Sequence, residues 1–214
     1  MDTTTLADLR RDYSLRELSE TGVDHDPFTQ FAAWFDEALE SQVLEPNAMT
    51  MSTVDADGRP SSRVVLLKGF GADGFVFFTN YGSKKAADLA QNANITLHFF
   101  WPDLERQVNI RGQAAKTSRE ESEAYFASRP FESRIGAWAS EQSSVIASRA
   151  ELEKRFGEMR SQYQGVDVPC PPFWGGFCVV PERFEFWQGR ASRLHDRICY
   201  DLVNCTWMIA RLSP

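Results

Sequence analysis

The sequence predicts a mainly β protein with added helices (α+β), arranged as a closed or nearly closed antiparallel barrel. Short β-rich runs follow one another directly, and Asp-Gly turns at residues 57–58 and 73–74 separate the first three of them. Helical stretches are inserted among these runs and do not alternate with them, which disfavours a parallel, doubly wound sheet. The 214 residues, 43% of them hydrophobic, are enough to bury a full core without disulfides or structural metal.

The first regular element is an amphipathic helix at about residues 26–41. Asp26 is a suitable N-cap, and Pro27 suits the first helical position. One face of this helix gathers apolar side chains at helical spacing, namely Phe28, Phe31, Ala32, Phe35 and Leu39.

The other elements are predicted from β-rich runs and from helix signals. We expect strands at residues 47–55, 59–70, 74–80, 94–101, 106–116, 177–181, 183–189 and 205–212. We expect further helices at residues 83–92, 118–129 and 148–163. Residues 166–176 are rich in Pro and Gly and are expected to form a loop. No repeat or clear linker divides the chain, so we expect an amino-terminal segment, residues 1–25, followed by one domain, residues 26–214.

Composition excludes several classes of partner. The 23 basic and 30 acidic residues give a net charge of -7, which argues against binding to nucleic acid or to an anionic membrane. The four cysteines and three histidines follow no metal-binding spacing, so no metal site is expected. The chain starts without a basic, apolar signal sequence, and its apolar runs are too short to cross a bilayer. We therefore expect a cytoplasmic protein with free thiols.

Basic residues are concentrated between Arg59 and Lys116. This stretch contains eight basic and four acidic residues, which gives it a net charge of +4. Within this stretch Lys84 and Lys85 follow Gly82 and occupy the first turn of a predicted helix. Free backbone N–H groups and the helix dipole favour an anion at that place, and two ammonium groups strengthen the attraction. The alternative is a solvated pair of surface lysines.

Two strand positions could also meet ligands. Arg63 and Lys68 lie five residues apart on a predicted strand, so alternation sends them to opposite faces, where they could serve two anions. Taken alone, each could equally be a surface charge at a strand end. Gln107 offers both a donor and an acceptor, as the edge of a heteroaromatic ring would require, although an isolated Gln is not specific.

The run from residue 186 to residue 197 is dense in side chains that carry chemistry. Trp187 can stack on a planar ring, Arg193 and Arg197 can pair with phosphate or carboxylate, and His195 can change its charge near neutral pH. The alternative is a hairpin in which Asp196 merely pairs with an arginine. No Ser-His-Asp pattern, P-loop or GxGxxG is present, so acyl transfer, NTP hydrolysis and Rossmann-type hydride transfer lack support.

Several longer motifs together resemble the pyridoxine (pyridoxamine) 5'-phosphate oxidases, a family of FMN-binding split barrels. The motifs, in chain order, are RVVLLKGF, FFTNYGSKKA, ERQVNIRG, YFASRPFESRIGAWASEQSSVI, FWGGF and FEFWQGRASRLHDR. The resemblance runs from about Arg10 to Pro214. It implies an antiparallel FMN-binding split barrel and a homodimer with FMN at the subunit interface.

The resemblance implies a set of FMN-binding residues. Lys84 and Lys85 would bind the FMN phosphate, and Gln107 would contact the flavin ring. The full set comprises Arg63, Val64, Val65, Leu66, Leu67, Lys68, Phe78, Thr79, Lys84, Lys85, Gln107, Gln142, Ser143, Trp187 and Arg197. The family usually has Arg-Lys where this chain has Lys84-Lys85, so we expect a somewhat weaker affinity for FMN.

It also implies a substrate site. The substrate-binding positions are Arg10, Arg11, Asp12, Tyr13, Lys68, Tyr125, Arg129, Ser133, Arg193, Leu194 and His195. Residues 1–25 would include a segment that covers the substrate. Arg193 and His195 would be the catalytic residues at the pyridine ring, and the sequence leaves open whether His195 removes a proton or only positions the substrate.

The implied reaction is oxidation of pyridoxine 5'-phosphate and pyridoxamine 5'-phosphate to pyridoxal 5'-phosphate. Hydride passes from the C4' carbon to the flavin, and O2 then accepts the electrons and leaves as H2O2. One alternative is a non-catalytic FMN or pyridoxal-phosphate carrier on the same fold, and another is a split-barrel reductase with a different acceptor. A second phosphate pocket favours the oxidase over both.

Overall fold

The computed structural model describes residues 12–214. These residues form two compact units. We call residues 47–96 and 112–181 the pocket unit, and residues 12–46, 97–111 and 182–214 the terminal unit. Within the described part of the chain, no helix is both long enough and apolar enough to cross a membrane.

The described strands form one sheet, in the order β2-β1-β5-β6-β7-β4-β3, and β8 pairs with both β7 and β9. The pairs β1–β2, β3–β4, β4–β7, β7–β8 and β8–β9 are antiparallel. The predicted antiparallel sheet with inserted helices is therefore confirmed.

The strands of the pocket unit begin with β1 (Ala48–Val54), β2 (Pro60–Leu66), β3 (Gly69–Gly71) and β4 (Gly74–Asn80). Three longer strands, β5 (Asn94–Trp101), β6 (Arg106–Lys116) and β7 (Trp174–Gln188), contribute residues to both units. In this unit β4 pairs with the start of β7, so that Phe78 lies opposite Gly176.

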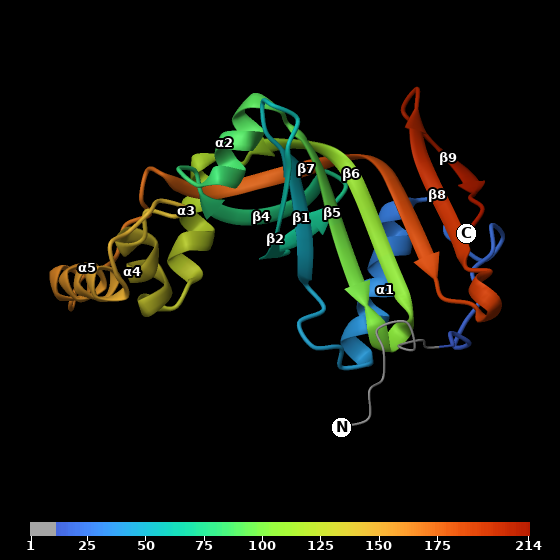
Figure 1. The fold of residues 1–214 in the computed structure, drawn as a ribbon, viewed down its shortest axis with the longest axis horizontal. Coiled ribbons are helices and arrows are strands. Elements are labelled where there is room, and N and C mark those ends of the chain that lie inside the picture. Colours follow the sequence, from blue (N-terminus) through green and yellow to red (C-terminus); the bar gives the residue numbers. More distant parts are fainter. Residues whose placement is uncertain (1–11) are drawn as a thin grey trace. The chain divides into compact units, whose positions relative to one another are not determined.

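Four helices belong to the pocket unit: α2 (Lys84–Gln91), α3 (Arg119–Ser128), α4 (Phe131–Ala139) and α5 (Arg149–Gln162). Figure 1 shows α3, α4 and α5 following one another beside the end of β4 and the start of β7. Their shared core is a cluster of Phe126, Ile135, Val168 and Trp174. This cluster joins α3, α4, the segment around Val168 and the start of β7, and Phe78 of β4 packs against it.

Three local predictions about these elements were wrong. The expected strand 59–70 stops at Leu66, resumes at Gly69 as β3, and leaves Lys68 between the two strands. The expected loop 166–176 ends early because β7 starts at Trp174. The expected break near Pro181 does not occur, since β7 runs through it as one strand.

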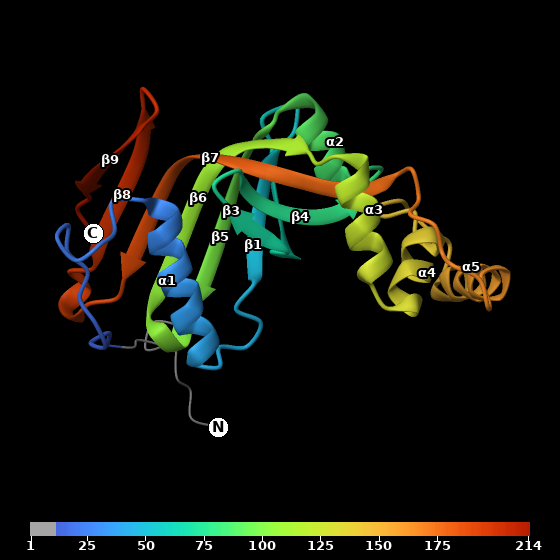
Figure 2. The same ribbon diagram turned by 180° about the vertical axis from the view of Figure 1, so that it is seen from behind.

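The terminal unit is built around α1 (Pro27–Glu40), which was predicted almost to the residue. Asp26 caps α1 by accepting hydrogen bonds from the backbone N–H groups of Phe28 and Thr29. In Figure 2 α1 lies against β5 and β6, and its Phe31 ring contacts the Phe99 ring with centroids 5.1 Å apart. The unit ends in the hairpin of β8 (Asp196–Val203) and β9 (Thr206–Arg211).

Candidate functional site

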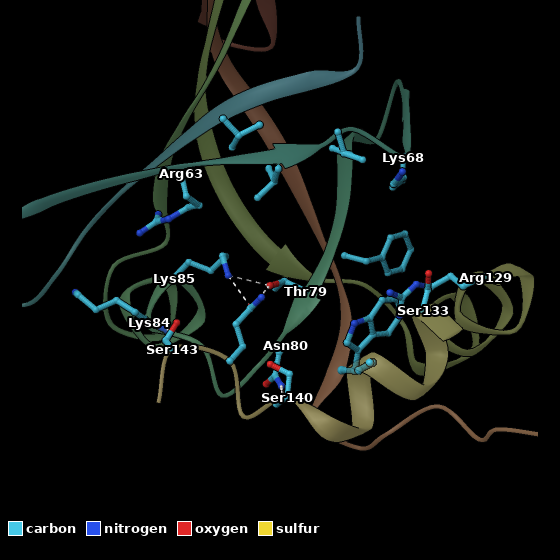
Figure 3. A pocket seen from close by; sticks show the side chains of 18 of the residues that line it. Arg63, Lys68, Thr79, Asn80, Lys84, Lys85, Arg129, Ser133, Ser140 and Ser143 are labelled. Atoms are coloured by element: carbon cyan, nitrogen blue, oxygen red, sulfur yellow. Dashed lines mark hydrogen bonds between the residues drawn. The ribbon is translucent and has the colours of Figure 1, made fainter. Parts of the chain in front are cut away.

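A pocket of about 1060 Å³ lies within the pocket unit. It is bordered by β2, by the end of β4, by the first turn of α2, by α3 and α4, and by the chain after α4 (Figure 3). The residues predicted from the sequence that line it are Arg63, Val64, Val65, Leu66, Lys68, Phe78, Thr79, Lys84, Lys85, Tyr125, Arg129, Ser133, Gln142 and Ser143. Segments far apart in the chain thus supply a single cavity.

Lys85 is a buried cation, and within residues 12–214 its hydrogen-bond partners are all neutral oxygens. Its Nζ donates to Gln142 Oε1 at 2.8 Å and to the hydroxyls of Thr79 and Ser83 at 3.2 Å each. Burial, together with the nearby charge of Arg63, lowers the pKa of Lys85 to about 8. A desolvated ammonium group without a counter-charge makes this end of the pocket favourable for an anion.

Arg63 lies beside Lys85 in the pocket (Figure 3), and hydroxyl groups hold its guanidinium. Its guanidinium donates to Thr53 Oγ1 at 2.8 Å and to Ser61 Oγ at 2.6 Å. Burial lowers the pKa of Arg63, while the charge of Asp88 acts in the opposite direction. Arginine remains charged at any physiological pH, so Arg63 attracts an anion throughout this range, and Lys85 adds a second positive charge below pH 8.

Lys84 differs from Lys85 because it has acidic partners. Its Nζ lies 2.8 Å from Asp88 Oδ1 and 3.6 Å from Asp55 Oδ2. The hydrogen bond to Asp88 is the main reason that the pKa of Lys84 is raised. The backbone N–H of Lys84 donates to Ser143 Oγ at 3.2 Å, which brings the segment after α4 to the start of α2.

Asp88 was missed in the sequence, although its i,i+4 spacing from Lys84 was a visible signal. The carboxylate is buried, and its second oxygen accepts a hydrogen bond from Thr53 Oγ1 at 2.8 Å. Burial alone would raise the pKa of Asp88, but the hydrogen bonds from Lys84 and Thr53 lower it. Asp88 therefore stays ionised and links Lys84 to Thr53, the hydroxyl that holds Arg63.

A second cationic group, formed by Lys68 and Arg129, lies with the hydroxyl of Ser133 across the pocket from Arg63, Lys84 and Lys85 (Figure 3). The guanidinium of Arg129 stacks 4.8 Å from the Trp174 ring centre. The buried Nη1 of Arg129 has no hydrogen-bond partner among the described residues. Burial also lowers the pKa of the Arg129 guanidinium. A buried donor of this kind is costly unless a ligand satisfies it, so this end of the pocket also favours an anion.

An aromatic wall stands beside the second cationic group. The rings of Phe78 and Tyr125 stack at 4.1 Å, and Phe78 also stacks on Trp174 at 5.5 Å. A Cβ at Gly176 would lie 2.9 Å from the Phe78 ring and 2.6 Å from Thr117 Oγ1, so glycine is needed where β7 passes this wall. Trp174 belongs to the FWGGF motif, but the sequence did not predict that it lines the pocket.

Other expected residues belong to the terminal unit. Trp187 and Arg197 are direct partners across β7 and β8. The centroids of the His195 and Trp187 rings lie 4.6 Å apart. The centroid of the Tyr13 ring lies 5.7 Å from that of Trp187 and 5.8 Å from that of His195. The chain thus brings Tyr13, Trp187 and His195 into one aromatic cluster.

The proton arrangement of His195 follows from one backbone hydrogen bond. The N–H of Arg190 donates to His195 Nδ1 at 3.1 Å, so Nδ1 is the acceptor and the neutral ring carries its hydrogen on Nε2. Burial lowers the pKa of His195, and the charge of Arg193 lowers it further. His195 is therefore a neutral Nε2–H donor at neutral pH.

Asp196 pairs with arginines, as the simpler interpretation of this run expected. Its carboxylate lies 2.7 Å from Arg211 and 3.3 Å from Arg190. These contacts, after the hydrogen bond from the Leu18 N–H, outweigh burial and lower the pKa of Asp196. Asp196 is thus part of a charge network beside His195.

The remaining expected residues that the structure describes lie outside the pocket and outside the aromatic cluster. Arg193 and Leu194 are exposed, and Arg193 has a positive φ of 62°. Gln107 is half-buried on β6, and Asp12 is exposed. Leu67 is buried and does not line the pocket, while its backbone N–H donates to the Asn47 carbonyl at 2.8 Å. Arg10 and Arg11 lie outside the described residues.

The antiparallel sheet and its helices define a split-barrel protein. A structure described as PhzG from Burkholderia lata 383 in complex with tetrahydrophenazine-1-carboxylic acid has this fold, with a TM-score of 0.89, 27% identity, and coverage of 95% of this chain and 100% of that one. A pyridoxamine 5'-phosphate oxidase-related, FMN binding protein from Nostoc punctiforme matches with a TM-score of 0.69 and 16% identity over 88% of this chain and 98% of that one.

Sequence comparison then gives the family. Residues 35–163 match the family model described as pyridoxamine 5'-phosphate oxidase, and residues 174–214 match the pyridoxine 5'-phosphate oxidase C-terminal dimerisation region. A pyridoxine/pyridoxamine 5'-phosphate oxidase of Gloeothece citriformis is 57% identical over 211 residues, 98% of this chain and 99% of the relative. The chain belongs to the pyridoxamine 5'-phosphate oxidase family.

Proposed function

We propose that this protein is an FMN-dependent oxidase that converts pyridoxine 5'-phosphate and pyridoxamine 5'-phosphate to pyridoxal 5'-phosphate, using O2 and releasing H2O2. The observation that carries the proposal is the pocket with cations at two separate ends. Cofactor and substrate are both phosphate esters, and each needs its own set of cations and donors. The curated relatives named for this activity support the proposal.

The first cationic end fits the phosphate of FMN. Lys85 and Arg63 supply charge, Ser143 supplies a hydroxyl, and the first turn of α2 supplies backbone N–H groups. The partners of Lys85 in the described part of the chain are neutral, so a phosphate would provide a counter-charge. The family match and the description of the Nostoc punctiforme protein as FMN binding support this assignment.

The second cationic end fits the phosphate of the substrate. Arg129 offers a buried donor without a partner among the described residues, and Lys68 adds a second charge. Ser133 lies in the first turn of α4, where backbone N–H groups also favour an anion. A carrier of FMN alone would not need this second end.

Bound FMN would supply the acceptor for the two electrons and the hydrogen that leave the substrate's C4' carbon, and O2 would regenerate it. The protein's own residues bind and orient. We assign His195 the role of a hydrogen-bond donor through Nε2 toward the substrate ring, because its Nδ1 is already engaged by the Arg190 N–H. Arg193 is proposed to act beside it, as the resemblance implies.

We further propose a homodimer with FMN at the subunit interface, which the match to a dimerisation region supports. Residues 1–25 are proposed to be the segment that covers the substrate, ahead of one domain at 26–214. Gln107, Trp187 and Arg197 keep their proposed roles at FMN, as do Asp12 and Tyr13 at the substrate. Asp12 and Tyr13 mark the beginning of the described part of that segment.

The test is to purify the protein and identify the chromophore released on denaturation. Oxygen uptake is then followed with pyridoxine 5'-phosphate, pyridoxamine 5'-phosphate and unphosphorylated pyridoxine. We expect FMN, uptake with both phosphates and equimolar H2O2, with far less uptake for pyridoxine. Bound FMN without uptake from either phosphate would favour the carrier, and reduction of another acceptor without oxygen uptake would favour the reductase.

A further inference from the structure

Glu105 combines two features that are unfavourable for a glutamate. It follows a 3₁₀ turn (Pro102–Leu104) with a φ of 54°, a left-handed conformation that favours glycine or asparagine. Its residue is only 3% exposed, so an acidic side chain is held away from water. Both the positive φ and the burial of its carboxylate make glutamate costly at this position. We therefore look for an interaction that compensates, and other residues of the terminal unit supply one.

The Glu105 carboxylate holds the amino-terminal segment. Its Oε2 accepts hydrogen bonds from the backbone N–H of Ser14 at 2.9 Å and from that of Leu15 at 3.1 Å. The residue just before them, Tyr13, packs edge-on against Trp187 and His195. A carboxylate that accepts two N–H groups at once fixes the path of the chain at that point, and it therefore fixes the place from which Tyr13 projects.

Gly189 makes room for this arrangement. Its N–H donates to the Glu105 carbonyl at 2.8 Å. A Cβ at position 189 would lie 2.7 Å from Cγ of Tyr13 and 3.0 Å from Cβ of Glu105. The Tyr13 side chain thus occupies space that any other residue at position 189 would fill.

A second attachment lies three residues further along the chain. The Leu18 N–H donates to Asp196 Oδ2 at 3.0 Å, and the Leu18 carbonyl accepts from Arg211 at 2.9 Å. Between these two backbone attachments, side-chain ion pairs join Arg16 to Glu37 and Glu17 to Arg190. Glu105 binds the backbone next to Tyr13, and Asp196 with Arg211 binds the backbone around Leu18.

We propose that Glu105 is a positioning residue of the oxidase, which acts by seating Tyr13 on Trp187 and His195 through the amides of Ser14 and Leu15. The hydrogen bonds from Ser14 and Leu15 to Glu105 are seen in the structure, and their effect on substrate binding rests on the proposed function. Either claim can be wrong while the other holds, so we test the hydrogen bonds and the effect on substrate separately.

The first measurement is amide hydrogen exchange on the FMN-loaded protein. Glu105→Gly removes the carboxylate and adopts the positive φ without strain, and comparison with Glu105→Gln separates the lost hydrogen bonds from the backbone freedom that glycine adds. We expect the Ser14 and Leu15 amides to exchange about tenfold faster or more, with Leu18 unchanged. Glu105→Gln, whose amide oxygen can accept the same two bonds, should restore most of the protection. Asp103→Asn, which neutralises an exposed carboxylate in the same turn, should leave all three amides unchanged.

The second measurement is steady-state kinetics of the same variants. We expect Glu105→Gly to raise KM for pyridoxine 5'-phosphate about fivefold to tenfold, with a smaller change in kcat and full FMN content. Gly189→Ala should reproduce this shift, because its methyl group displaces Tyr13. Unchanged exchange at Ser14 and Leu15 in Glu105→Gly would overturn the proposal. Faster exchange with an unchanged KM would also overturn the positioning role. A protein without turnover in any form would contradict the proposed function, and the exchange experiment would still decide the contact.

Discussion

Lys85 shows how the fold prepares a place for an anion before any ligand arrives. Its ammonium group is buried among neutral oxygens beside Arg63, and its pKa of about 8 lies well below the ordinary value of 10.5. Below pH 8 Lys85 is charged in the folded protein, and its burial lowers the free energy of unfolding by its full amount. Between pH 8 and 10.5 the unfolded chain binds more protons at this residue, so its contribution to stability rises with pH.

A bound phosphate reverses that balance, because it offers the counter-charge that Lys85 lacks. We expect the affinity for FMN to be greatest from pH 7 to 8 and to fall above pH 8, as Lys85 loses its proton. The measurement is a fluorescence titration of apoprotein with FMN between pH 7 and 9.5. Lys85→Gln should weaken FMN binding about tenfold to a hundredfold and remove the alkaline decline. An affinity that is constant over this range in the unaltered protein would contradict the assignment.

Lys84 is the position at which this chain departs from the usual family residue. Its Nζ is engaged by Asp88 and Asp55, which leaves less of its charge for a phosphate. An arginine could keep the bond to Asp88 and present a second edge to the ligand. We therefore expect Lys84→Arg to bind FMN about threefold to tenfold more tightly in the same titration. Unchanged or weaker binding would contradict a phosphate role for this residue.

His195 can be tested through the nitrogen that its neighbour leaves available. The Arg190 N–H occupies Nδ1, so a donor at Nε2 is what remains for the substrate. His195→Gln places an amide N–H near the position of Nε2, and we expect it to retain about a tenth or more of kcat/KM, while His195→Ala falls further. The pKa of His195 lies below its usual 6.5, so kcat/KM should decline only as the pH falls below that value. Equal losses in the two variants would favour a role as base.

At the scale of elements, two glycines with opposite surroundings offer a matched pair. A Cβ at Gly112 on β6 would lie 2.1 Å from the Val180 carbonyl oxygen on β7, whereas one at Gly157 in α5 would meet nothing within 4 Å. We expect Gly112→Ala to lower the free energy of unfolding by about 1–3 kcal/mol. Gly157→Ala should raise it by about 0.5–1 kcal/mol, because alanine is the better helix former. Urea unfolding measures both, and a Gly112→Ala protein as stable as the original would contradict the close approach of β6 and β7.

The elements that the sequence predicted well are those with strong local signals. The helix from Pro27 to Glu40 has a capping aspartate, a proline at its first position and a clear apolar face. By contrast, α4 was missed because it is short and capped by a proline, and β8 because its DRICYDLV run does not alternate in the expected way. β7 was divided at Pro181, since sequence reasoning treats an internal proline as a break.

Many residues that the sequence singled out line one pocket, but the sequence did not predict how they are arranged there. Arg63 and Lys68 were expected on opposite faces of one strand, but Lys68 follows the end of β2 and both line the same pocket. Asp88 and the hydroxyl of Thr53 could not be foreseen as a supporting pair, because their contact spans 35 residues. Long-range contacts of this kind depend on how the sheet closes, which local patterns do not encode.

At the scale of the whole molecule, the proposed FMN site at the subunit interface links cofactor binding to assembly. We expect a homodimer with about twice the chain mass of 24.3 kDa. FMN that binds across the interface must stabilise the dimer by mass action, so removing it should raise the dimer dissociation constant. Sedimentation at several protein concentrations, with and without FMN, measures this shift. A dimer whose dissociation is indifferent to FMN would place the cofactor within one subunit.

The division of the chain into two units has a consequence for inheritance. The polypeptide passes from one unit to the other at 46–47, 96–97, 111–112 and 181–182, and each unit is assembled from separate stretches. No single recombination point can therefore exchange one unit for that of a relative. Exact exchange of a whole unit needs a crossover at all four of these places, and a chimera joined at one position between residues 47 and 181 would combine segments of two relatives in both units.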